Sequence, residues 1–194
     1  MKWSLYLTLG LCLLQSLNSY GKTFGQEEII QKYFDILKSE STDFEPTGAV
    51  CERVAVRELV AEYPADKYFI KNGIQYDERN MTIGELDVVV FDKATGMVEA
   101  VAEVKCWKSF EGARKKAKEQ RMRFQTYLNK NIVIYDDEGK KYQKNQFALV
   151  RRYFAISQFG GVGQGFDVEL PLDFKEMMEL RKRLLDCRAF KNCL

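Results

Sequence analysis

Three ionisable residues lie inside two strongly apolar segments, and their types and spacing could support hydrolysis at a metal ion. Asp87 lies in the segment GELDVVV (84–90), and Glu103 and Lys105 lie in AEVK (102–105). A charge in such a run is costly unless a metal ion or an ion partner compensates it. Two carboxylates can hold a divalent cation, while a neighbouring lysine deprotonates or orients a water molecule and stabilises developing charge. The set therefore predicts metal-assisted attack of water on a phosphate group.

The positions of these residues along two strands determine whether they can meet. Side chains alternate between the faces of a strand, so Asp87 shares a face with Glu85 and Val89, and Glu103 shares one with Lys105. The turn signal KATG (93–96) separates the two segments and predicts a hairpin. One hairpin can thus present all three site residues, with Glu85 at the rim. The alternative is a structural ion pair of the same residues on an exposed sheet face.

The composition narrows the chemistry, because none of the 194 residues is histidine. This excludes Ser-His-Asp and Cys-His nucleophilic systems, zinc sites with histidine ligands and histidine-dependent nucleases. The remaining chemistry uses carboxylates, lysine and hard metal ions. Mg2+ and Mn2+ accept the oxygen ligands that Asp and Glu provide, so the sequence favours one of these two ions as the cofactor.

The periodicity of apolar residues predicts the elements that would position this site. Apolar residues at helical spacing predict helices at 27–39, 48–63, 109–129 and 173–187. Apolar and β-branched runs predict strands at 68–76, 82–92, 97–107 and 147–156, with a further hairpin around 136–139. The first three strands should form an antiparallel meander. The predicted fold class is α/β, with a mixed, mainly antiparallel sheet flanked by helices.

The order of these motifs and elements resembles the PD-(D/E)XK nuclease superfamily, whose core runs helix, strand, strand, strand, helix, strand. Asp87 is similar in placement to the aspartate of the first motif, although its proline is missing, and EVK (103–105) is similar to E-X-K. The variant ELD (85–87) resembles the branch that includes Holliday-junction resolvases and RecB-like proteins. The resemblance covers residues 48–128 and implies a restriction-endonuclease-like core over residues 48–160.

The resemblance also implies a metal-binding set. It assigns metal binding to Asp87, Glu103 and the carbonyl of Val104, and it makes Lys105 the catalytic lysine. The segment GAVCER (48–53) is similar to one that carries a further acid in the same branch, so Glu52 is carried over as a catalytic and metal-site residue. The alternative for Glu52 is a solvated position on an exposed helix face.

The helix predicted at 109–129 carries residues that could position nucleic acid. Arg114, Lys118 and Arg121 recur at four- and three-residue spacing and could line a phosphate track, or else form a solubilising helix face. Gln120 is similar in placement to a glutamine of RecB-like members, whose following tyrosine is not matched; it could instead hydrogen-bond within the core. Because the net charge is only +2, nucleic-acid affinity would depend on such local clustering.

Residues 1–21 have the layout of a secretory signal peptide, with a basic start, an apolar run at 5–14 and a polar end. We therefore expect a secreted or periplasmic protein that begins near Lys22, with residues 22–194 as a single domain. The apolar run is shorter than the roughly 20 residues of a spanning helix, which disfavours a membrane anchor. A lipid anchor at Cys12 is disfavoured by the bulky Leu11 before it. No stable membrane association is predicted.

Four cysteines would remain after removal of the signal peptide: Cys51, Cys106, Cys187 and Cys193. An even number in an exported chain predicts disulfides. Cys187 and Cys193 lie close together beyond a helix and are the easiest pair to join, which leaves Cys51 and Cys106 as a second candidate pair. The sequence alone leaves the connectivity open.

These observations predict an exported, Mg2+- or Mn2+-dependent enzyme that hydrolyses phosphodiester bonds in DNA, with RNA as the other substrate of the same chemistry. The lack of a recognisable base-reading module predicts an endonuclease of low sequence specificity. Two alternatives stay open. One is a catalytically inactive nucleic-acid-binding module of the same fold, and the other is a disulfide-stabilised secreted interaction protein.

Overall fold

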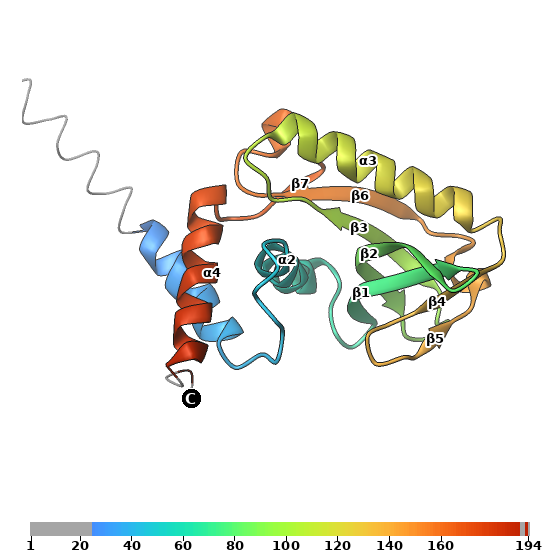
Figure 1. The fold of residues 1–194 in the computed structure, drawn as a ribbon, viewed down its shortest axis with the longest axis horizontal. Coiled ribbons are helices and arrows are strands. Elements are labelled where there is room, and N and C mark those ends of the chain that lie inside the picture. The colour runs from blue at the N-terminus through green and yellow to red at the C-terminus, as the bar shows by residue number, and fades with distance from the viewer. Residues whose placement is uncertain (1–24, 191–192, 194) are drawn as a thin grey trace, which may run out of the picture.

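A seven-stranded sheet forms the centre of the part of the chain that the structure describes (Figure 1). The structure is a computed structural model, and it describes residues 25–190 and residue 193. The predicted signal peptide lies outside these residues. The strand order is β5-β4-β1-β2-β3-β6-β7.

The middle of the sheet is the predicted antiparallel meander. It consists of β1 (Tyr68–Glu78), β2 (Met81–Asp92) and β3 (Val98–Val104). The tight turn between β1 and β2 has Arg79 and Asn80 in the left-handed region, at φ 53° and 63°. The positions of the three strands confirm the prediction from apolar and β-branched runs, apart from small differences at their ends.

The outer strands make the sheet mixed. On one side, β4 (Ile132–Tyr135) pairs antiparallel with β1 and with β5 (Lys141–Tyr142), which confirms the hairpin predicted around 136–139. On the other side, β6 (Arg152–Ser157) runs parallel to β3, and β7 (Val168–Glu169) runs parallel to β6. The predicted α/β class with a mixed, mainly antiparallel sheet is therefore confirmed.

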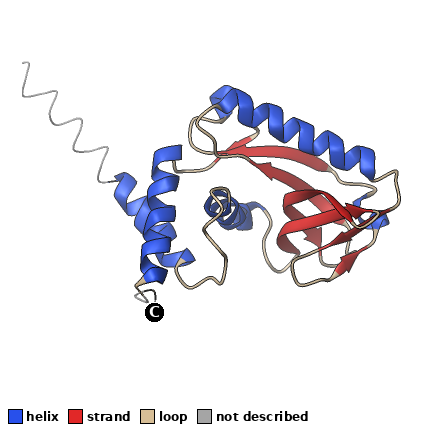
Figure 2. Cartoon of the chain, viewed as in Figure 1, coloured by secondary structure: helices blue, strands red, loops and turns tan. Residues whose placement is uncertain are grey.

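Helices cover both faces of this sheet (Figure 2). The long helix α3 (Phe110–Tyr127) lies along one face, beside β3 and β6 (Figure 1). The other face is covered by α2 (Ala49–Glu62), and beyond it lie α4 (Phe174–Ala189) and the helix at residues 25–37. Each of these four helices was predicted from its apolar periodicity.

Alternate residues of the central strands pack into two hydrophobic cores. Val88 and Val90 of β2 belong to the core shared with α2 and α4, whereas Val89 and Phe91 belong to the core beneath α3. Phe124 of α3 is completely buried in that second core. Because every residue of this part of β2 is buried on one face or the other, any charged residue there needs a specific partner.

The strand predicted at 147–156 is wrong in its first half. Phe147 instead ends a short 3-10 helix (Lys144–Phe147), and the strand begins only at Arg152. A capping box between Gln143 and Gln146 starts the short helix, and the Gln146 side-chain amide also donates to the carbonyl of Gly96 at 2.6 Å. These local hydrogen bonds compete with strand formation, so Phe147 enters the core from a turn.

Two cysteine pairs lie at disulfide-bonding distance. Cys51 and Cys106 have their Cα atoms 6.3 Å apart and join the start of α2 to the chain just after β3. Cys187 and Cys193 have their Cα atoms 5.2 Å apart and join the end of α4 to the chain that follows it. Both candidate pairs from the sequence are thus formed, which is compatible with an extracellular location. Within residues 25–190, no helix combines the length and apolar character needed to cross a bilayer.

Candidate metal centre

The predicted site lies at the carboxyl end of β3. The strand assignment ends at Val104, but the backbone N–H of Lys105 still donates to the carbonyl of Ile156 at 2.9 Å. The Ser157 hydroxyl donates to the carbonyl of Lys105 at 2.7 Å, and the Gln158 amide donates to the carbonyl of Trp107 at 2.7 Å. These bonds to β6 and its following residues fix the backbone of the E-X-K segment where the regular ladder ends.

Asp87, Glu103 and Lys105 come together as predicted, and all three are buried, with exposed fractions of 5%, 3% and 8%. The Lys105 ammonium donates to Asp87 Oδ2, lies 3.4 Å from Glu103 Oε2 and lies 3.0 Å from the carbonyl oxygen of Val104. The three residues do form ion pairs, but they are buried, so the alternative of an ion pair on an exposed sheet face is wrong about the exposure of the site.

An interruption of the strand pairing accompanies the inward position of Asp87. The β1–β2 ladder pairs Asn72 with Val88 and Ile74 with Leu86, and it skips the position between them. At that position Gly73 has φ 69°, in the left-handed region that favours glycine. The β2–β3 ladder ends close by, at the pair Val88 and Ala102.

At this point the Asp87 side chain, instead of a strand carbonyl, accepts a backbone hydrogen bond from the neighbouring strand. The backbone N–H of Val104 donates to Asp87 Oδ2 at 2.7 Å instead of to a strand carbonyl. A carboxylate that accepts from both a backbone N–H and an ammonium is held in one orientation by charge-assisted hydrogen bonds. These two hydrogen bonds thus fix the Asp87 carboxylate against the E-X-K segment.

Burial and mutual repulsion shift the ionisation of the acids. Loss of solvent, followed by repulsion from Asp87, raises the pKa of Glu103 well above its ordinary value. At Lys105 burial opposes the charged form, but attraction by Asp87 and Glu103 outweighs it and raises the lysine pKa. Lys105 therefore stays a cation and compensates the carboxylates around it.

Glu52 and Glu85 lie near this cluster without joining it. Burial, and then repulsion by Asp87 and Glu85, raise the pKa of Glu52 to about 7. Burial and then Asp87 also raise the pKa of Glu85. Glu52 is thus a partly buried acid at the edge of the site rather than a solvated helix residue. Within the described residues, however, no group of three or more Asp, Glu, Cys or His side chains is arranged to hold a metal ion.

The donor atoms at Asp87, Glu103 and Val104 nevertheless fit a hard divalent cation. The Lys105 ammonium contacts an oxygen from each of these residues, so three oxygen donors already surround one cationic group. The second carboxylate oxygen of Glu103, Oε1, is buried and has no hydrogen-bond partner among the described residues. Mg2+ is commonly held by one or two carboxylates and keeps several water ligands, so it does not require a third acid.

The basic residues of α3 lie beside this acidic cluster. A cavity of about 230 Å³ is lined by Glu103 together with the three predicted basic residues, Arg114, Lys118 and Arg121. The stripe predicted from the helical spacing therefore faces a recess that ends at one of the site carboxylates, and positive charge there suits a phosphate group. Gln120 does not line this cavity, but its Oε1 atom is buried with no hydrogen-bond partner among the described residues.

The loop after β6 supplies parts of the cavity that the sequence did not indicate. Asp167 lines the cavity and its carboxylate accepts from the backbone N–H of Ala155 at 2.8 Å. Gly165 has φ 87°, and a Cβ atom there would lie 2.9 Å from the Nη1 atom of Arg114. The glycine content of residues 160–165 was a usable signal for close approach of another group, whereas Asp167 carried none.

Comparison of the chain with family models, with curated proteins and with solved structures finds no match.

Proposed function

We propose that this protein is a divalent-metal-dependent nuclease, in which Asp87, Glu103 and Lys105 form the reactive centre. The observation that carries the proposal is the buried contact of the Lys105 ammonium with both carboxylates and with the Val104 carbonyl. Burying three ionisable groups in a well-packed sheet gives little net stability compared with apolar residues. Such a costly cluster beside a cavity is typical of a functional site.

Each residue has a distinct role in this proposal. Asp87 and Glu103, with the carbonyl of Val104, would hold Mg2+ or Mn2+, and Glu52 would support them from α2. A bound cation would supply charge stabilisation at the scissile phosphate and would activate a water molecule. Lys105, displaced from its contacts with the carboxylates, would orient the attacking water and stabilise the negative charge that develops.

In this proposal the basic cavity would bind the phosphate backbone of the substrate. Arg114, Lys118 and Arg121 would contact phosphate oxygens, with the scissile group directed at Glu103. These contacts read no base edges, which supports the expectation of low sequence specificity. DNA is the proposed substrate, and RNA offers the same phosphate groups.

The order of elements supports a restriction-endonuclease-like core. The chain runs α2, β1, β2, β3 and α3 without interruption, and the site residues lie on β2 and β3. In this proposal the last strand of that core would be β6, which pairs parallel with β3 and follows the β4–β5 hairpin in the chain. The two disulfides agree with export, which would separate the activity from the DNA of the producing cell.

A cleavage assay tests this proposal. The mature protein is incubated with labelled single- and double-stranded DNA, and with RNA, in Mg2+, in Mn2+ or in EDTA. We expect cleavage in either metal and none in EDTA, and we expect Asp87→Ala and Lys105→Ala to lose it. Lys108→Ala is the matched control, because Lys108 is exposed and close in sequence. Cleavage that persists in EDTA or in Lys105→Ala would reject the proposed centre.

A catalytically silent nucleic-acid-binding module is the second candidate. One observation favours it: the Lys105 ammonium forms ion pairs with both Asp87 and Glu103 and so compensates their charge. This candidate predicts salt-sensitive binding of DNA that depends on Arg114, Lys118 and Arg121, with no cleavage in Mg2+ or Mn2+. The same assay, combined with a binding titration, separates the two functions.

A further inference from the structure

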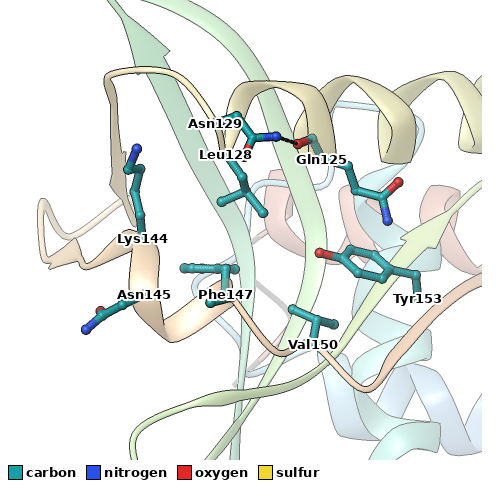
Figure 3. A pocket seen from close by; sticks show the side chains of 9 residues that line it. Gln125, Leu128, Asn129, Lys144, Asn145, Phe147, Val150 and Tyr153 are labelled. Carbon is teal, nitrogen blue, oxygen red and sulfur yellow. Dashed lines mark hydrogen bonds between the residues drawn. The ribbon is translucent and has the colours of Figure 1, made fainter.

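A second and larger cavity lies further along α3 and β6. It has a volume of about 580 Å³ and lies between the end of α3, the 3-10 helix at Lys144–Phe147 and the start of β6 (Figure 3). This volume is within the range of roughly 300–1,000 Å³ that is usual for small-molecule sites. None of the residues assigned above to the metal centre or to the basic stripe lines it.

The lining of this cavity combines an apolar floor with amide groups and one aromatic ring. Leu128, Phe147 and Val150 form apolar walls, and Gln125 contributes a side-chain amide. Figure 3 shows the Tyr153 ring beneath Gln125, with its hydroxyl directed toward the middle of the cavity. A flat ligand with hydrogen-bonding groups on its edge matches this combination, since its faces can pack on the aromatic ring while its edge meets the amides.

The Tyr153 hydroxyl is available for such a ligand. The side chain is only partly buried, and Figure 3 draws no hydrogen bond between this hydroxyl and the other residues shown. Burial raises the pKa of Tyr153, so its hydroxyl stays protonated and can both donate and accept at neutral pH. Asn145 and Lys144 add an amide and a positive charge at the outer rim.

The two cavities follow one another between α3 and β6. In the β3–β6 ladder, Glu103 pairs with Ala155 and Val101 pairs with Tyr153. Ala155 lines the basic cavity, so Tyr153 lies two strand residues, or roughly 6.6 Å, further along β6. On the opposite wall, Arg121 of the basic cavity and Gln125 of the second cavity are four residues apart, or about one helical turn.

From this arrangement we infer that the second cavity binds an unpaired nucleobase next to the phosphate held by Arg114, Lys118 and Arg121. The inference rests on the proposed function and deepens it by naming the substrate class, which is single-stranded nucleic acid or a strand with a base turned out of its stack. A base within a duplex is stacked and paired, so it cannot place a face on Tyr153. Stacking on aromatic side chains tolerates any base, in agreement with low sequence specificity.

Binding in EDTA tests the inference independently of cleavage. Fluorescence anisotropy compares a labelled single strand, the same strand with abasic residues, and the corresponding duplex. We expect wild-type protein to prefer the intact single strand, and we expect Tyr153→Leu to weaken that binding about tenfold. The abasic strand should bind wild type and Tyr153→Leu equally, because it has no base that could stack on the Tyr153 ring. Leu149→Ala, at an exposed position outside the cavity lining, is the control and should bind like wild type.

A second variant protects the test against misfolding of Tyr153→Leu. Gln125 is exposed on α3, so Gln125→Ala should leave the fold intact and weaken single-strand binding by a smaller factor. Equal binding of intact and abasic strands by wild type, or unchanged binding by both variants, would overturn the inference.

The outcomes also separate this inference from the proposed nuclease. Metal-dependent cleavage with unchanged binding by the Tyr153 and Gln125 variants would reject the base site and keep the nuclease. Base-dependent binding without cleavage in any metal would keep the base site and reject the nuclease. If wild type binds no oligonucleotide, the base site is rejected.

Discussion

The backbone N–H of Val104 donates to the carboxylate of Asp87 at 2.7 Å, and this bond joins the two sequence motifs of the candidate site across the end of the β2–β3 ladder. The same carboxylate oxygen accepts from the Lys105 ammonium. One oxygen of Asp87 therefore orients both the E-X-K backbone and the lysine. Within this cluster, Glu103 retains a buried oxygen with no partner among the described residues.

Asp87→Asn removes the charge of this side chain and keeps its shape. Asp87→Asn can still accept from the Val104 N–H but leaves Lys105 with a weaker partner, so we expect a loss of about 3 kcal/mol in the free energy of unfolding. Cleavage should fall by at least about 100-fold, because a carboxylate that holds the cation is lost. Urea unfolding and the cleavage assay measure the two effects. Wild-type activity in a folded Asp87→Asn protein would contradict the assignment.

Removal of Lys105 should separate metal binding from chemistry. In Lys105→Ala the two carboxylates lose the ammonium that compensates them, and a divalent cation can take its place. We therefore expect Mg2+ or Mn2+ to raise the unfolding temperature of Lys105→Ala more than that of wild type, while cleavage is lost. Thermal unfolding with and without metal measures the shift, and Lys108→Ala should behave like wild type. A smaller metal-induced shift in Lys105→Ala than in wild type would argue against metal binding at these carboxylates.

The raised pKa values of the acids predict an unusual pH dependence of stability. Burial, Asp87 and Glu85 raise the pKa of Glu52 from its ordinary value of 4.5 to about 7, and the pKa of Glu103 is shifted in the same direction. Between these values the folded protein binds more protons than the unfolded chain, so its stability is greatest on the acid side and falls as the pH rises. Groups with lowered pKa, such as Asp136 and Glu40, titrate below this window.

Thermal unfolding in EDTA between pH 5 and 8 measures this effect. The unfolding temperature should decrease toward pH 8. Glu52→Gln should flatten the curve, because it removes one of the three acids with a raised pKa, which are Glu52, Glu85 and Glu103. Saturating Mg2+ should also reduce the decrease. A stability that rises with pH across this window would show that the folded protein does not raise the pKa values of these acids.

The Cys51–Cys106 disulfide joins the helix that carries Glu52 to the segment just after β3 that carries Lys105. It closes a loop of 55 residues, so the chain-entropy model gives a contribution of about 4 kcal/mol to the free energy of unfolding. The Cys187–Cys193 pair is separated by only 6 residues and should contribute about 2 kcal/mol. Urea unfolding of the two double-serine variants compares these effects. A larger loss from the Cys187–Cys193 variant would contradict this order.

Gly165 leaves the space that the guanidinium of Arg114 occupies. Its φ of 87° is strained for any side chain, and a Cβ atom would come 2.9 Å from Arg114 Nη1. Gly165→Ala should therefore displace the guanidinium and weaken DNA binding several-fold, with a reduced salt dependence. Gly163→Ala is the matched control, because its Cβ atom would meet nothing within 4 Å. Equal DNA binding by Gly165→Ala and Gly163→Ala would contradict the proposed contact of Arg114 with phosphate.

The sequence predicted those parts of the fold that depend on local periodicity. The apolar and β-branched runs around Asp87 and Glu103 located β2 and β3, and the apolar stripe within residues 109–129 located α3. In the structure the Ser109 side chain accepts from the backbone N–H of Gly112 at 3.3 Å and so begins that helix. The convergence of Asp87, Glu103 and Lys105 followed from these strands, because strand pairing limits where their side chains can point.

Features that depend on tertiary contacts could not be obtained in this way. The interruption at Gly73 depends on how β1 meets β2, and the replacement of a strand by a 3-10 helix before Arg152 depends on the contact of Gln146 with Gly96. The cavity around Tyr153 is formed by segments from three parts of the chain, none of which has a distinctive sequence by itself. Such contacts link residues far apart in sequence and leave no periodic signal.

The central claim is most directly tested by the nicking of supercoiled DNA by the mature, oxidised protein in Mg2+, compared with EDTA and with Glu103→Gln. We predict that wild type nicks the DNA in Mg2+ and not in EDTA. In Glu103→Gln, whose side chain has nearly the same shape, nicking should fall by at least about 100-fold. Equal nicking by wild type and a folded Glu103→Gln, or none by wild type in either Mg2+ or Mn2+, would contradict a metal-dependent centre at Asp87, Glu103 and Lys105.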